Sequence, residues 1–198
     1  MLATRRRAMV NAGFVFSFGR MTADEISVFV APSRVYSRQD VLTRPCPVPA
    51  EPGVYGWWFR RWPSPVSTGG CRCHQGLVLL YAGISPDRPP ANGRPASKQT
   101  IADRIRYHYT GNAEGSTLRK TLGCLLASEL GIELRRVGSG SRMTFGAGEK
   151  VLSAWMAENA FVSWMARDAP PGSSRPRPAV PVEDSDRIRS PVPMQSDR

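Results

Sequence analysis

The segments GVYGWWF (residues 53–59) and LLYAGIS (residues 79–85) decide the fold. Each is a short apolar run that carries one tyrosine close to a glycine, and both runs favour strands of one small sheet. Tyr55 and Tyr81 therefore have closely similar settings. Phenols that only fill a core need no such matched placement, so these two tyrosines are candidate functional residues.

The chain after these strands changes to helical periodicity. Apolar residues recur at helical spacing through TIADRIRYHYTG (residues 100–111), with Thr100 as N-cap and Gly111 as a stop. Residues 116–131 predict a second helix, whose buried face holds Leu118, Leu122, Leu125 and Leu126. A third helix is predicted in residues 148–160.

Two further segments predict strands. Residues 161–166 (FVSWMA) alternate as a strand does, and residues 25–31 are apolar enough to add a short one. The predicted fold class is therefore α+β, with a small, mostly antiparallel three-stranded sheet flanked by helices.

The charge of the chain favours a phosphate-rich partner. The 198 residues have a formal net charge of +11, from 27 Lys and Arg against 16 Asp and Glu, and nearly all the cations are arginine. Guanidinium groups match phosphate oxygens, and each neutralised phosphate releases counterions, so DNA is the expected partner. A genome that favours arginine codons, leaving a solvated basic surface, explains the charge equally well.

The cysteines favour a reducing, cytoplasmic location. Four unevenly placed residues are too few for a disulfide framework. Cys71, Cys73 and His74 form half of a zinc-site pattern, but no second pair of ligands follows, so a loop with free thiols is favoured. No stretch reaches the roughly 18 apolar residues of a membrane span, so no membrane partner is expected.

The first predicted helix carries two further candidate residues. Arg104 and His108 lie four residues apart, so both project from one face of that helix. The alternative is a basic stripe that faces water. The order of the parts favours a functional role, because a tyrosine strand, a tyrosine–glycine strand and a loop precede a helix with arginine and histidine.

In this order of parts the chain resembles the GIY-YIG nuclease family. GVY (residues 53–55) matches its first motif and YAG (residues 81–83) its second, with Ala82 in place of the usual isoleucine or valine. RIRYH (residues 104–108) supplies the arginine and the histidine. The resemblance covers residues 51–169, and residues 111–136 and 143–159 are similar to a bacterial subfamily.

The resemblance implies a DNA endonuclease that hydrolyses a phosphodiester with a divalent metal, Mg²⁺ or Mn²⁺. Tyr55 and Tyr81 would flank the scissile phosphate, and one of them would help to activate the attacking water. Arg104 would hold the negative charge of the phosphorane as it develops, and His108 would assist by hydrogen bonding or by proton transfer. Gly53 and Gly83 are the glycines of the two motifs.

The metal ligand that the family uses is not found where the resemblance places it. Family members hold the ion with a glutamate on a helix after the third strand, and an asparagine follows later. Residues 170–198 contain seven prolines, no asparagine and no glutamate on a plausible helix, so the last helix of the fold is predicted to be missing. Glu158 is the obvious substitute, but it precedes the third strand, and we expect it to face solvent.

Two explanations of residues 170–198 stay open. One is a natural disordered tail. The other is an out-of-frame reading, because the bases for PGSSR (residues 171–175) can encode Trp-Glu-Leu-Glu in the next register. The expected domain covers residues 25–169, and residues 1–24 are expected to be disordered or an over-extended gene start. The sequence thus predicts an impaired GIY-YIG endonuclease domain or, alternatively, a non-catalytic nucleic-acid-binding module.

Overall fold

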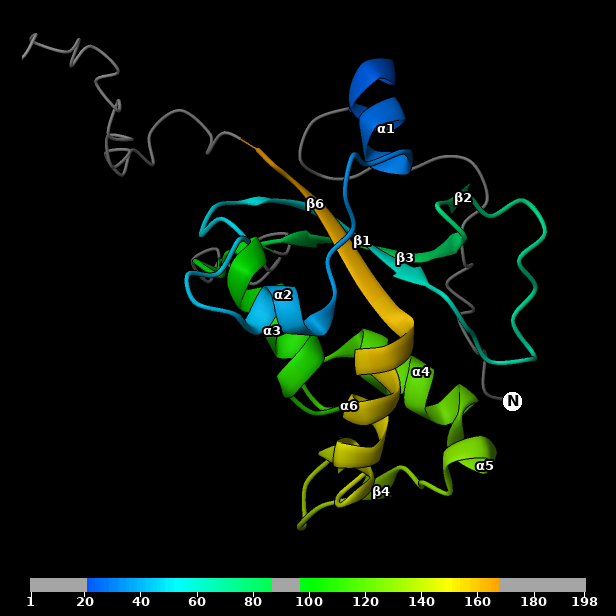
Figure 1. Ribbon diagram of the computed structural model, residues 1–198. Coiled ribbons are helices and arrows are strands. Elements are labelled where there is room, and N and C mark those ends of the chain that lie inside the picture. The colour runs from blue at the N-terminus through cyan, green and yellow to red at the C-terminus, as the bar shows by residue number, and fades with distance from the viewer. Residues whose placement is uncertain (1–20, 87–96, 168–198) are drawn as a thin grey trace, which may run out of the picture.

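A four-stranded antiparallel sheet forms the centre of the computed structural model, which describes residues 21–86 and 97–167 (Figure 1). The strand order is β2-β3-β1-β6. The long strands are β1 (Gly53–Phe59), β3 (Leu77–Ser85) and β6 (Ala160–Ala166), and β2 (Cys73–His74) adds two residues beside β3. The predicted α+β class and antiparallel sheet are confirmed.

Strand β1 lies between β3 and β6, and all seven of its residues are buried. Its alternate residues serve two cores. Tyr55, Trp57 and Phe59 pack in the larger core, whereas Val54 and Trp58 pack in a smaller one on the opposite face. A central strand buried on both faces explains why GVYGWWF is a continuous apolar run.

Helices cover both faces of this sheet (Figure 1). The smaller core is closed by α1 (Ala23–Val30), whose Phe29 is buried there. The larger core is closed by α2 (Arg38–Leu42), α3 (Ile101–Thr110), α4 (Thr117–Leu125) and α6 (Gly148–Asn159). The short helix α5 (Ala127–Leu130) and the hairpin of β4 (Arg135–Arg136) and β5 (Met143–Thr144) connect α4 to α6.

Helix α3 has the boundaries that the sequence predicts. Thr100 is its N-cap: the Thr100 hydroxyl accepts a hydrogen bond from the backbone N–H of Asp103, and the Asp103 carboxylate accepts one from that of Thr100. This reciprocal capping box fixes the start of the helix. Gly111 ends it, and Ile101 and Ile105 are fully buried.

Two local predictions were wrong. Residues 25–31 do not form a strand, because Thr22 and Glu25 form a second capping box that starts helix α1 at Ala23. Leu125 is 36% exposed and does not join the core. Helix α4 ends at Leu125, and the non-helical turn at Leu126 points that residue, not its neighbour, into the core.

The folded part begins before residue 25, since Thr22 already caps α1. The expectations for residues 1–20 and for residues 170–198, including the last helix, lie outside the described residues. None of the helices in residues 21–86 and 97–167 has the length and apolar character that crossing a bilayer requires.

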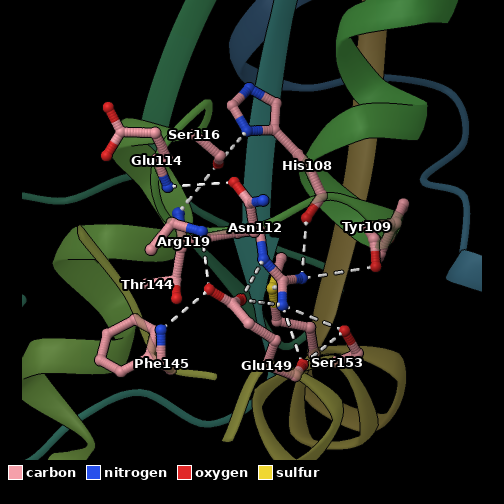
Figure 2. A network of polar contacts seen from close by, with 12 residues as sticks. His108, Tyr109, Asn112, Glu114, Ser116, Arg119, Thr144, Phe145, Glu149 and Ser153 are labelled. Carbon is pink, nitrogen blue, oxygen red and sulfur yellow. Dashed lines mark hydrogen bonds and ion pairs between the residues drawn. The ribbon is translucent and has the colours of Figure 1, made fainter. Parts of the chain in front are cut away.

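A buried arginine ties the helices of the larger core together (Figure 2). The guanidinium of Arg119 in α4 is fully buried and pairs with the carboxylate of Glu149 in α6 at 2.7 Å. It also donates to the Ser153 hydroxyl and to the backbone carbonyls of His108 and Tyr109 at the end of α3. Three helices thus meet at one side chain.

The carboxylate of Glu149 extends this network into two loops. Its Oε1 atom accepts hydrogen bonds from the backbone N–H groups of Ala113 (2.8 Å) and Phe145 (3.2 Å). Its Oε2 atom accepts from Nε and Nη2 of Arg119. A buried charge is tolerated only when it is paired and hydrogen-bonded, and here both charges are.

Replacing Arg119 with methionine should therefore lower the free energy of unfolding by about 3–5 kcal/mol, because Glu149 would keep a buried charge without its partner. Urea denaturation of the full chain measures this loss. The exposed pair Arg61–Glu129 has the same 2.7 Å separation and is the matched control. Arg61→Met should cost less than about 1 kcal/mol, and equal losses in the two variants would contradict the central role of Arg119.

Candidate functional site

The pairing of β1 with β3 places both tyrosines on one face of the sheet. Tyr55 is opposite Gly83, and Trp57 is opposite Tyr81. A Cβ atom at residue 83 would overlap the phenol ring of Tyr55, so only glycine leaves room for that ring. Gly53 has a different reason to be glycine, because a Cβ there would overlap the backbone carbonyl of Met165 in β6.

His108 of α3 lies against these two strands and joins the site residues. Its Nε2 atom is 3.0 Å from the hydroxyl of Tyr55. Its ring centre is 6.0 Å from that of Tyr81, in an edge-on arrangement, and 5.6 Å from that of Trp57. The structure thus brings Tyr55, Tyr81 and His108 together.

The imidazole of His108 is fully buried and therefore neutral over most of the pH range. Its pKa is lowered from 6.5 to about 3, first by burial and then by the positive charges of Arg104 and Arg119. A basic stripe facing water is excluded for this residue. A neutral imidazole has one N–H donor and one acceptor, so His108 links Tyr55 on one side to Ser116 on the other, where its Nδ1 atom is 2.7 Å from the Ser116 hydroxyl.

Arg104 is half-buried one helical turn before His108. Its Nη1 atom donates to the backbone carbonyl of Gly115 at 2.8 Å. Its Nε atom is buried and has no hydrogen-bond partner within residues 21–86 and 97–167. A buried N–H without a partner is costly, and at a candidate site it indicates a position for an acceptor such as a phosphate oxygen.

Residues 53–172 match the family model of the GIY-YIG catalytic domain. The chain belongs to this family. Its members are nucleases that act on DNA and are generally metal-dependent. Searches of curated proteins and of solved structures found no match. The matched segment contains the strands β1, β3 and β6 and the helix that carries Arg104 and His108.

The position after β6, where the family holds its metal-binding glutamate, lies outside the described residues. They contain no group of three or more His, Cys, Asp or Glu side chains that could bind an ion. A family site with a single glutamate needs only one, and among the described residues Glu51 and Glu158 are the glutamates that are not in ion pairs. Glu25, Glu114, Glu129, Glu133 and Glu149 each pair with an arginine or lysine.

Glu158 is at the wrong end of the sheet for that role. It is exposed, as expected, and directly precedes β6, whose first residue Ala160 is opposite Phe59. Tyr55 is four residues further along β1, a separation of about 13 Å at the rise of a strand. The end of β6 near residue 166 is closer to Tyr55, since Trp164 is its partner there.

Sequence reasoning missed two residues that shape the site, Ser116 and Arg119. Ser116 was recognisable only as a helix cap, and its contact with His108 requires the turn between α3 and α4. Arg119 is an arginine in an amphipathic helix, where a solvent-exposed position is the usual expectation. The only signal in the sequence is helical spacing, which puts Arg119 on the same face of the helix as Leu118 and Leu122.

The lowered pKa of His108 predicts a loss of stability as the pH falls. Below pH 6.5 the unfolded chain takes up a proton at this histidine, whereas the folded chain does so only near pH 3. The free energy of unfolding should therefore decrease by up to about 1.4 kcal/mol for each pH unit lost in this window. Urea titrations between pH 7 and about 5, where carboxylates stay ionised, measure this slope.

His108→Asn should flatten that slope, because the titrating group is gone. His74, the second histidine of the chain, is the matched control, and His74→Gln should leave the contribution of His108 in place. A slope that survives His108→Asn unchanged would show that His108 is not the buried neutral group.

Proposed function

We propose that this domain binds a DNA phosphodiester at the face formed by Tyr55, Tyr81, Arg104 and His108. The observation that carries the proposal is the buried, unpartnered Nε–H of Arg104, one helical turn from His108, whose ring contacts both tyrosines. The net charge of +11 supports an anionic partner of this kind. Membership of the GIY-YIG family supports DNA as that partner.

Each residue has a role that its surroundings allow. The guanidinium of Arg104 is anchored at Nη1 by the carbonyl of Gly115, and its other N–H groups would bind phosphate oxygens and stabilise the charge of a phosphorane. An unperturbed phenol has a pKa of about 10, so a tyrosine acts as a base only when a neighbour stabilises its phenolate. His108 is the neighbour of Tyr55 in this structure.

Hydrolysis is proposed to be impaired in the chain as written. The described residues contain no group of three or more potential metal ligands, and the only glutamate in residues 170–198 is Glu183, which has prolines on both sides in the sequence. A family site without its ion would still hold phosphate through Arg104. A non-catalytic nucleic-acid-binding module is therefore the second candidate function, favoured by the absence of a plausible metal-binding helix in the sequence of residues 170–198.

Both readings predict DNA binding that depends on Arg104 and on salt. Arg104→Ala should weaken binding of a short duplex by about 1–3 kcal/mol, and affinity should fall steeply as salt rises. Fluorescence anisotropy on the full chain measures both effects. Arg106, an exposed arginine on the same helix, is the matched control and should matter less. Binding that is absent, or that does not respond to salt, would contradict both candidate functions.

Cleavage assays separate the two candidates. The chain as written should cut DNA slowly or not at all with Mg²⁺ or Mn²⁺, because losing one electrostatic element of such a site costs about 10²–10³ in rate. Restoring the alternative frame after Ala169 should create cleavage that depends on the new glutamate and on Tyr81. Glu158→Gln should leave that cleavage unchanged, and if it instead abolishes cleavage by the written chain, Glu158 is the ligand.

A further inference from the structure

The hydroxyl of Ser116 lies between the start of α4 and the ring of His108 (Figure 2). Ser116 is the N-cap of α4 and is fully buried. Its Oγ atom accepts a hydrogen bond from the backbone N–H of Arg119 at 3.1 Å. It is also 2.7 Å from Nδ1 of His108. Within the described residues these are its two hydrogen-bond contacts.

The two contacts determine the direction of the hydrogen bonds. The Arg119 N–H can only donate, so Ser116 is an acceptor on that side. If His108 also donated from Nδ1, the Ser116 proton would be buried without an acceptor in the described part of the chain. If Ser116 donates to an unprotonated Nδ1, the Ser116 hydroxyl and both ring nitrogens of His108 have partners. Buried polar groups are rarely left unpaired, so the second arrangement is preferred.

We propose that Ser116 is a positioning residue that holds His108 in its Nε2–H tautomer, so that the ring donates its hydrogen bond to the oxygen of Tyr55. The chain of donors then runs from the Arg119 backbone through Ser116 to His108 and on to Tyr55. The burial of His108 beside two arginines agrees with this, since only a neutral ring has a tautomer to select.

The consequence for Tyr55 rests on the proposed function, whereas the direction of the hydrogen bonds does not. With Nε2 already protonated, His108 cannot take the proton of Tyr55. Its N–H instead points at the phenol oxygen, and a donor in that position favours the charged form of its acceptor. The family resemblance allows His108 to act by hydrogen bonding or by proton transfer. The proposed tautomer assigns it the hydrogen-bonding role.

The turn at residues 115–116 also positions Arg104. Gly115, next to Ser116, accepts the hydrogen bond from Arg104. A Cβ atom at Gly115 would overlap the phenol end of Tyr107, so a larger residue there would displace that ring. Residues 115 and 116 therefore orient the guanidinium and the imidazole of the site together.

The tautomer can be observed directly in the free protein, without DNA or metal. Long-range ¹H–¹⁵N correlation spectra of the labelled full chain at neutral pH distinguish a protonated from an unprotonated ring nitrogen. The signals of His108 are assigned by their loss in His108→Asn. We expect Nε2 to be the protonated nitrogen. A protonated Nδ1 overturns the proposal, and neither result depends on whether the chain cleaves DNA.

Two variants test whether Ser116 is responsible. Ser116→Ala removes the donor and should shift the Nδ1 resonance of His108. Ser116→Asp retains a helix cap but can only accept, so it should move the proton to Nδ1. Ser37→Ala is the matched control, because it removes the N-cap of α2 and should leave the His108 resonances unchanged. Unchanged His108 resonances in folded Ser116 variants overturn the proposal, and if the variants do not fold, the wild-type spectrum decides.

Discussion

The buried guanidinium of Arg119 is the constraint on which the rest of the helical layer depends. A charge in the core is stable only when its donors all find acceptors, and those acceptors come from the end of α3 and the start of α6. The backbone N–H of Arg119 donates a hydrogen bond to the Ser116 hydroxyl, which is in turn hydrogen-bonded to His108. The position of the site histidine is thus coupled to the packing of three helices.

The charges around His108 explain how the site can hold a buried neutral histidine and still attract an anion. Arg104 and Arg119 lie near the ring and, with burial, keep it neutral. The charge of Arg119 is balanced by Glu149, whereas within the described residues Arg104 has no ion pair. The uncompensated charge therefore belongs to the residue whose Nε–H also lacks a partner there, which is the arrangement a phosphate group would complete.

Local signals in the sequence were sufficient for the parts of the site that lie on single elements. The tyrosine strands, the cap at Thr100 and the spacing of Arg104 and His108 each follow from short-range patterns. The burial of His108 and its contact with Ser116 depend on how α3 packs and turns. The Arg119–Glu149 pair joins residues 30 apart, which periodicity cannot detect. The strand predicted at 25–31 was wrong because the apolar character of the segment was given more weight than the capping box of Thr22 and Glu25.

The central claim is that a phosphate of DNA completes the hydrogen bonding of Arg104 on the tyrosine face of the sheet. Chemical-shift mapping of the labelled full chain during titration with a short duplex tests this most directly, because the Arg104 Nε–H signal reports the group itself. This signal should move strongly when DNA binds, together with the signals of Tyr55, Tyr81 and the loop at Gly115. An unchanged Arg104 Nε–H signal, with the shifts gathered on the exposed β4–β5 hairpin, would contradict it.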